Sequence, residues 1–283
     1  LSGPVQETGG YPSLHLGHVV QDERRQVEQF GHKGEVRFVA VDPMLAPGFE
    51  SWLWDGSAEA GGWSEDGGSI TQVRSAYTGG PVSAYAVVAD AGARAKALER
   101  IAAAEPGDLV AAKDGAVVPQ AGVLRRMRLQ AIDAVAAKAR ARVGPGADLR
   151  TAFLAEYWRI SLDQSIFDHE GRHALDQAAA PQIGALSDTD LELRAKLSEL
   201  ELGEVPKLSL FQIDGGLLGG DTPHGIANAK IVTALRDWAQ AHPGEIAGYD
   251  ASKPALSQLD RLSDDQIRAV AASLAPWAAS PPR

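Results

Sequence analysis

The stretch Ser161–Gln177, SLDQSIFDHEGRHALDQ, contains the residues around which we expect the rest of the chain to fold. Within it, His169, Glu170 and His173 form an H-E-x-x-H motif. On an α-helix, residues four apart lie on the same face, so both imidazoles can reach one metal ion. The carboxylate of Glu170 would then lie beside the open coordination position of that ion and could accept a proton from water held there. The motif therefore predicts a hydrolytic metal site.

The residues around the motif favour a helix. No proline lies between Ser161 and Ala180, and the side chain of Ser161 or Asp163 can cap the N-terminus. Apolar residues that can face a core are interspersed with the polar ones: Ile166, Phe167, Ala174 and Leu175. The alternative interpretation is a polar helix face that carries two solvent-exposed histidines.

The composition is that of an ordinary globular protein, because 45% of the 283 residues are hydrophobic and 23% are charged. A chain of this length can bury a substantial core in one large domain or two smaller ones. The formal net charge of -10 arises from interspersed acidic and basic residues. This argues against a nucleic-acid-binding surface, and no Lys/Arg-rich run indicates binding to an anionic membrane. No apolar stretch is long enough to span a bilayer.

The chain contains no cysteine, which excludes disulfides and thiolate metal ligands. It begins at Leu1 rather than at Met, and a cleaved signal peptide, a shortened expression product or a removed tag would each explain this. Export to the periplasm or the medium is therefore an expectation beside a cytosolic location. The abundance of Ala, Gly, Arg and Pro is typical of high-GC bacterial genomes.

Residues 1–146 are expected to form an N-terminal α+β region that supplies a small sheet and one wall of a cleft. Glu35–Asp42 and Pro81–Asp90 have the alternation and β-branched content of strands. Asp108–Gln120 resembles a short hairpin, whereas Gly122–Val143 has the apolar spacing of a long amphipathic helix. Residues 48–68 contain three tryptophans among glycines and acids, and we expect an irregular loop there.

Residues 147–283 are expected to form a helical region that begins after the Gly144-Pro145-Gly146 break. Leu149–Ile160 is amphipathic and precedes the motif, and a capping sequence at Ser187 starts a helix that Gly203 ends. Thr222 and Pro223 supply the cap and first turn of another helix that extends to about Ala241. Lys207–Ile213 is a candidate strand, and a capping box at Ser263–Gln266 opens the last helix. The fold class that we predict is thus α+β, mostly helical.

A catalytic zinc site needs three protein ligands and one open position. Two candidates for the third ligand, Glu192 and Glu199, lie on the helix after Ser187. They are two turns apart on the same face, so the spacing alone does not distinguish them. Either could also be a solvated glutamate, because half of this helix is charged.

Other residues are candidates for supporting roles. Metal-binding histidines usually donate their second ring nitrogen to a carboxylate or carbonyl, and Asp176, one turn after His173, is a reasonable partner. Hydrolysis also needs a donor for the oxyanion that forms on the scissile carbonyl. His224 lies in the first turn of a helix that follows a glycine-rich loop, where it can face a cleft. Tyr157 and Tyr249 are weaker candidates for the oxyanion donor.

The sequence His169–Asp176, HEGRHALD, together with Glu192–Ala195, ELRA, resembles the gluzincin branch of the zincin metallopeptidases. The E-x-x-A arrangement of the second segment is similar to that in which gluzincins present their third ligand, so the resemblance favours Glu192 over Glu199. It implies a zincin-like core, a Zn2+ cofactor, and hydrolysis of a peptide or protein substrate with Glu170 as general base. A metzincin site is excluded because no H-x-x-G-x-x-H continuation follows His173.

Two alternatives remain open at this point. The chain could be a non-catalytic zinc-binding or scaffold protein that keeps a zincin-like fold without turnover, or it could hydrolyse a non-peptide amide. A zincin holds the substrate backbone against a sheet edge. No convincing strand directly precedes the motif helix, so we expect this edge to come from Glu35–Asp42 or Val82–Asp90.

Overall fold

The computed structural model describes residues 16–47, 54–55, 61–65, 68–144, 147–213, 220–275 and 277. Its described strands are β1 (Leu16–Gln29), β2 (His32–Pro47), β3 (Trp54–Asp55), β4 (Gly62–Glu65) and β5 (Ser69–Val73). They form one sheet with the order β1-β2-β5-β4, and β3 pairs with β2 beside this path. β1 and β2 are antiparallel, β2 and β5 are parallel, and β4 runs antiparallel to β5.

A tight two-residue turn joins β1 to β2. Gln29 pairs with His32, and the two residues between them, Phe30 and Gly31, have φ values of 51° and 78°. Positive φ at both central positions matches the right-handed twist of the strands, as in type I′ hairpins. The turn therefore fixes the register of the two longest strands.

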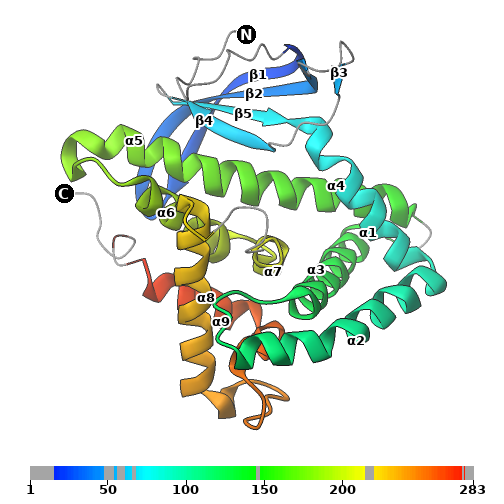
Figure 1. Ribbon diagram of the computed structural model, residues 1–283. Helices are drawn as coiled ribbons and strands as arrows, with labels where there is room; N and C mark the ends of the chain where they lie inside the picture. The colour runs from blue at the N-terminus through cyan, green and yellow to red at the C-terminus, as the bar shows by residue number, and fades with distance from the viewer. Residues whose placement is uncertain are drawn as a thin grey trace.

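A continuous helical rod runs beneath the sheet (Figure 1) and consists of α4 (Leu149–Leu162), η2 (Asp163–Glu170) and α5 (Gly171–Ile183). The middle segment, η2, is a π-helix, and the backbone N–H of Gly171 donates to the carbonyl of Ile166 five residues earlier. Gly184, with a φ of 82°, ends the rod. π-Helical turns are rare and often occur at functional sites; this one contains the first two residues of the H-E-x-x-H motif.

Most of the other helices lie on the side of the rod away from the sheet, whereas η1 packs against β2 and leads into α1, which passes α4 (Figure 1). The described α-helices are α1 (Gly79–Ala89), α2 (Ala91–Lys113), α3 (Ala121–Arg142), α6 (Asp188–Leu202), α7 (Pro206–Leu210), α8 (Pro223–Ala241) and α9 (Asp264–Ser273). Short 3-10 helices are η1 (Arg74–Tyr77), η3 (Pro243–Glu245) and η4 (Ala255–Arg261). Among these described helices, none has the length and apolar character needed to cross a bilayer.

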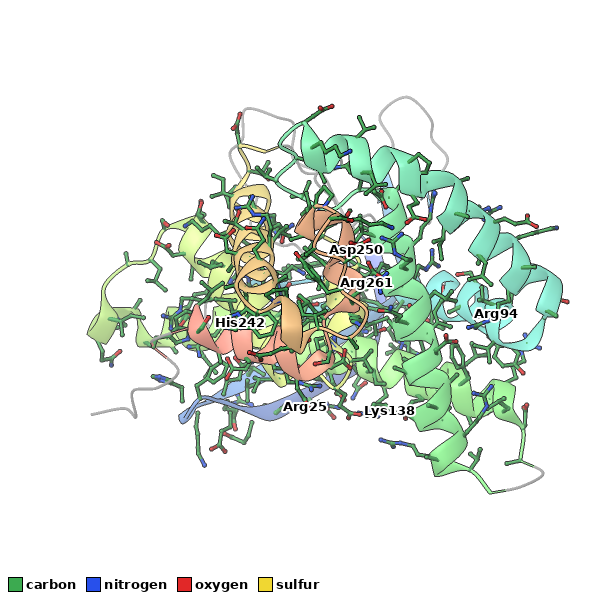
Figure 2. All side chains as sticks on the ribbon, turned by 90° about the horizontal axis from the view of Figure 1, so that it is seen from below. Arg25, Arg94, Lys138, His242, Asp250 and Arg261 are labelled. Carbon is green, nitrogen blue, oxygen red and sulfur yellow. The ribbon has the colours of Figure 1, made fainter. Side chains whose placement is uncertain are left out.

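The hydrophobic core continues across the Gly144–Gly146 break. One cluster joins Ala131 and Val135 of α3 to Phe153 and Tyr157 of α4. A larger cluster joins α3 to the C-terminal helices α6, α8 and α9. Charged side chains occupy the outer faces, where Arg94 of α2 pairs with Asp133 and Lys138 of α3 pairs with Glu204 (Figure 2). Residues on both sides of the predicted boundary therefore share their cores.

The α+β, mostly helical fold class is confirmed, and so are most of the predicted helices. Strand Glu35–Asp42 lies within β2, and Ser187, Thr222 and Ser263 cap α6, α8 and α9 as expected. Ser263 and Gln266 form the predicted capping box.

Three predicted strand segments are wrong. Pro81–Asp90 falls in α1 up to Ala89, and Asp108–Gln120 begins within α2, which continues through Pro106 to Lys113. Lys207–Ile213 overlaps α7 as far as Leu210. Short apolar runs do not distinguish strand from helix by periodicity, and packing of these segments against α3 and α4 decides in favour of helix. The sequence analysis also missed β1, β4 and β5.

Candidate metal centre

The sheet packs directly against the motif helix through glycines. A Cβ added at Gly62 of β4 would collide with Cδ1 of Ile166 and would lie 2.8 Å from the carbonyl oxygen of Thr71, and one at Gly171 of α5 would lie 3.0 Å from Cγ1 of Val27 in β1. Only a residue without a side chain allows this approach at Gly62. In addition, the Gln29 side chain donates to the carbonyls of Phe167 and Asp168. These contacts fix the helix backbone immediately before His169.

His169, His173 and Glu192 converge in the interior of the protein. Nε2 of His169 lies 3.6 Å from Oε2 of Glu192, and Nε2 of His173 lies 3.5 Å from Oε1 of the same carboxylate. The two imidazole rings are 5.1 Å apart and nearly perpendicular. Both histidines are buried, and the side chain of Glu192 is 14% exposed. Thus α6 brings Glu192 to the open face of the motif helix.

Each imidazole nitrogen lies near a different oxygen of Glu192, and the described group whose ligand atoms all lie within 4.8 Å of one another consists of His169, Glu192 and His224, without His173. Tetrahedral zinc with bonds of 2.0–2.2 Å separates its ligand atoms by about 3.3 Å. In the described part of the chain, Oε2 of Glu192 is buried and has no hydrogen-bond partner, although two imidazole nitrogens lie close to it. A buried carboxylate oxygen without a partner is costly. A metal ion among these groups would remove that cost, so the donor set and its spacing fit Zn2+.

Glu199 holds the other nitrogen of His169. Its Oε2 lies 3.3 Å from Nδ1 of His169 and accepts a hydrogen bond from Nζ of Lys196 at 2.7 Å. A carboxylate at Nδ1 fixes the tautomer that leaves Nε2 free to bind a metal. The structure therefore brings both candidate glutamates to His169, with Glu192 on the side shared with His173 and Glu199 behind the ring.

The charges of the site are strongly coupled. Burial lowers the pKa of His169, but the carboxylates of Glu192 and Glu199 outweigh it and raise this pKa to about 9. Burial acts to raise the pKa of Glu199, yet Lys196 and His169 lower it to about 2. The pKa of Glu192 is held well below its usual range, because His169 and His173 outweigh its burial. Without a metal, His169 is therefore protonated at neutral pH between two carboxylates.

Asp176 does not have the role predicted for it. Both of its carboxylate oxygens accept hydrogen bonds from guanidinium groups: Oδ1 from Arg172 and Arg194 at 2.6 Å each, and Oδ2 from Arg194 at 2.7 Å. This ion-pair cluster takes the place of the expected hydrogen bond to His173, because the guanidinium groups of Arg172 and Arg194 occupy both oxygens of the carboxylate. Asp176 thus joins α5 to α6 and does not orient a histidine.

A cavity of ≈ 570 Å³ opens at the site and is bordered by His169, Glu170, Glu199 and His224. His224 lies in the first turn of α8, as expected, and its Nε2 is 3.0 Å from Oε2 of Glu192. Tyr157 also borders the cavity, whereas Tyr249 packs against the C-terminal core. Glu170, His224 and one motif histidine, His169, therefore border the same cavity, whereas His173 and Glu192 do not border it.

Two residues at the cavity were missed by the sequence analysis. The hydroxyl of Tyr77 lies 2.9 Å from Oγ of Ser165, and burial raises the pKa of Tyr77 to about 12. Lys196, whose side chain is 17% exposed, also borders the cavity. Tyr77 follows β5 by a few residues, so its place at the cavity could be predicted only from the position of β5 in the sheet, and that strand was not predicted. Lys196 follows Glu192 by one helical turn, a spacing that could have signalled its place on the same face.

The sheet edge at the cavity is β4, and not Glu35–Asp42 or Val82–Asp90 as expected. β4 ends the sheet beside β5, and Gly61 and Gly62 border the cavity. This short strand lies in the tryptophan- and glycine-rich segment that was expected to be a loop. Its glycine, Gly62, weakens the strand pattern but is the residue that lets β4 approach the motif helix.

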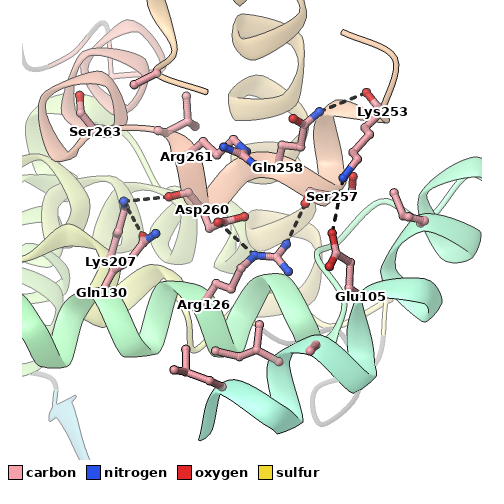
Figure 3. A pocket seen from close by; sticks show the side chains of 16 residues that line it. Glu105, Arg126, Gln130, Lys207, Lys253, Ser257, Gln258, Asp260, Arg261 and Ser263 are labelled. Carbon is pink, nitrogen blue, oxygen red and sulfur yellow. Dashed lines mark hydrogen bonds and ion pairs between the residues drawn. The ribbon is translucent and has the colours of Figure 1, made fainter. Parts of the chain in front are cut away.

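A second cavity, of ≈ 580 Å³, lies between α2, α3 and η4 (Figure 3). Four of its charged side chains form pairs with one another. Arg126 binds Oδ2 of Asp260 at 3.1 Å and the carbonyl of Ser257 at 2.9 Å, and Lys253 lies 3.5 Å from Glu105. None of the motif residues borders it.

No protein-family model matches this chain, and no curated protein or solved structure matches it significantly. Functional inference therefore depends on the geometry of the site.

Proposed function

We propose that this chain is a zinc-dependent metallopeptidase with a gluzincin-like centre. His169, His173 and Glu192 would hold the zinc, and Glu170 would act as general base. The observation that carries the proposal is the convergence of the two motif imidazoles on one carboxylate, 3.5 and 3.6 Å away, with a buried oxygen that lacks a hydrogen-bond partner among the described residues.

Zinc bound by three such ligands lowers the pKa of water and polarises a carbonyl. The other steps belong to residues of the chain. Glu170 borders the cavity next to His169, where its carboxylate can take the proton of the attacking water and pass it to the leaving amine. Tyr77, Lys196 and His224 border the same cavity and can supply a donor to the oxyanion.

The edge strand β4 supports a peptide as the substrate. It lies at the end of the sheet, and Gly61 and Gly62 border the cavity beside the motif helix. An extended peptide can add to such an edge through backbone hydrogen bonds. Gly61 and Gly62 add no side chain beside the backbone of this edge strand, so the scissile bond of a bound peptide could approach Glu170.

The second candidate is a non-catalytic zinc protein, and one observation favours it. His169, Glu192 and His224 each offer an atom within 4.8 Å of the other two, and Nε2 of His173, outside this group, lies 3.5 Å from the other oxygen of Glu192, so the four side chains together could form a closed site. Closed sites are typical of structural zinc. Hydrolysis of a non-peptide amide would use the same residues and would differ in its substrate profile.

The test is Glu170→Gln in protein loaded with zinc, assayed on casein and on a peptide library with and without a chelator. We expect cleavage by the wild type to be chelator-sensitive, and the variant to lose about 10²–10⁴-fold in rate while it keeps stoichiometric zinc. Glu28→Gln, on the exposed surface of β1, is the matched control. Wild-type protein that holds zinc but cleaves no peptide or amide would favour the scaffold, and an active Glu170→Gln would refute the assigned base.

A further inference from the structure

His224 lies among the ligand atoms rather than beyond them. Its Nε2 is 3.0 Å from Oε2 of Glu192, closer than the 3.6 Å that separates this oxygen from Nε2 of His169. Together the three residues form the described group of histidines and carboxylates whose ligand atoms all lie within 4.8 Å of one another. An oxyanion donor, in contrast, must lie about 3 Å from a substrate oxygen that is itself outside the protein ligands.

The short distance between His224 and Glu192 is not explained by a hydrogen bond. Within the described part of the chain, Oε2 of Glu192 has no partner in hydrogen-bond geometry, although the nitrogen of His224 is near enough for one. Two donor atoms that lie about 3 Å apart without pointing at each other have the arrangement of neighbouring ligands on one ion.

The backbone holds His224 firmly in this position. Thr222 caps α8, its Oγ1 accepting from the N–H of Gly225, and Pro223 occupies the first turn. One turn further on, Ala227 and Asn228 are buried, and α8 packs against α6, the helix that carries Glu192. The imidazole is nevertheless 43% exposed, so solvent or a substrate can reach it.

We propose that His224 is a fourth protein ligand of the metal in the resting protein. This inference rests on the metal centre of the proposed function and goes beyond it. With His169, Glu192, His224 and also His173, whose Nε2 lies 3.5 Å from the other oxygen of Glu192, as ligands, the centre would be closed and would offer no position for water. Hydrolysis then requires that water displace His224, and Glu170 can act only after this exchange. The resting protein is latent, and the exposed imidazole is the ligand that leaves.

The first test uses the unmodified protein, labelled with nitrogen-15 histidine and loaded with cadmium-113. Cadmium occupies zinc sites, and scalar coupling counts the imidazole nitrogens bonded to it. We expect three coupled imidazoles, assigned to His169, His173 and His224. Coupling to the two motif histidines alone overturns the inference but leaves the metallopeptidase proposal standing. Failure to bind cadmium or zinc at the motif overturns both.

The second test compares His224→Ala with His18→Ala, an exposed histidine on β1, in cobalt-loaded protein. We expect His224→Ala to change the visible cobalt spectrum, to weaken zinc binding at least about tenfold, and to bind acetohydroxamate at least about tenfold more tightly than wild type. His18→Ala should match wild type in each. An unchanged spectrum and unchanged hydroxamate affinity in His224→Ala would overturn the inference, and His224→Gln serves as the variant if the alanine protein does not fold.

Discussion

Two charged clusters join the motif helix to α6, and they differ in the groups that surround the carboxylate. In one, Asp176 of α5 lies between the guanidinium groups of Arg172 and Arg194. In the other, Glu192 of α6 lies between the imidazoles of His169 and His173. The two clusters are neighbours, since Glu192 and Arg194 are two residues apart on α6, yet the surroundings of the two carboxylates differ.

The difference lies in where the compensating charge comes from. Arg172 and Asp176 have side chains with 0% exposure, and both oxygens of Asp176 are hydrogen-bonded, so the chain itself supplies the cations. Glu192 is surrounded by imidazoles, and one of its oxygens lacks a partner among the described residues. In the first cluster the chain supplies the cations and both oxygens of Asp176 are paired, although Nε and Nη1 of Arg172 have no hydrogen-bond partner among the described residues. In the second cluster, the proposed metal would be the cation that pairs with Glu192. This distinction predicts opposite responses to mutation and to metal.

The largest expected effect is that of Asp176→Asn. Removing this charge leaves the buried guanidinium group of Arg172 and the partly buried one of Arg194 without their carboxylate, which should lower the free energy of unfolding by about 3–5 kcal/mol. Denaturant unfolding measures the change, and zinc analysis of the folded protein should still find one ion per chain. Asp133→Asn, in the exposed pair with Arg94, is the control and should cost less than about 1 kcal/mol. A stable Asp176→Asn that has lost its zinc would show that the two clusters are not separate.

A smaller effect is expected from Glu199→Gln. This carboxylate contacts Nδ1 of His169 and would orient the ring without binding the metal. Its loss should weaken zinc binding about 10–100-fold, which a competition titration with a chromophoric chelator can measure. Glu201→Gln, on the same helix, is the matched control. If Glu199→Gln binds no zinc at all, Glu199 and not Glu192 is the third ligand.

The smallest expected effect is a pH dependence confined to the metal-free protein. The pKa of His169 is raised from 6.5 to about 9 by Glu192 and Glu199, despite burial. Between these values the folded protein holds a proton that the unfolded chain has released. His169 therefore stabilises the fold fully below pH 6.5, and this contribution is lost as the pH rises through about 9. Melting temperatures in chelator should fall across this window, and His169→Gln should flatten the trend. If the melting temperature of the zinc-bound protein falls by the same amount across this pH window, the pH dependence arises from groups other than His169.

The sequence predicted the parts of the site that follow from local spacing. His169 and His173 share a face because they are four residues apart, and Glu192 reaches them because Ser187 starts α6 at the right point. The sheet was largely missed, because β1 is rich in charged residues and the glycines of β4 weaken its strand pattern. The role of Asp176 depends on Arg194, which lies 18 residues away, and no local pattern contains that contact.

The π-helix and the edge strand β4 also depend on contacts between residues that are far apart in the sequence. Gln164 donates to the carbonyl of Val205 and to Oγ of Ser209, and Ile166 packs under Gly62, so contacts with distant segments accompany the wider turn before His169. Tyr77 reaches the cavity only because β5 brings the chain to that end of the sheet. Local spacing thus predicted the residues that we propose as ligands, whereas the residues that border the cavity depend on long-range packing.

The most direct test of the central claim is an anomalous diffraction map at the zinc edge, from crystals of the protein grown with zinc. The account predicts one peak about 2.0–2.2 Å from Nε2 of His169, Nε2 of His173 and an oxygen of Glu192. A map without a peak there, with the imidazoles hydrogen-bonded to the glutamates instead, would contradict it.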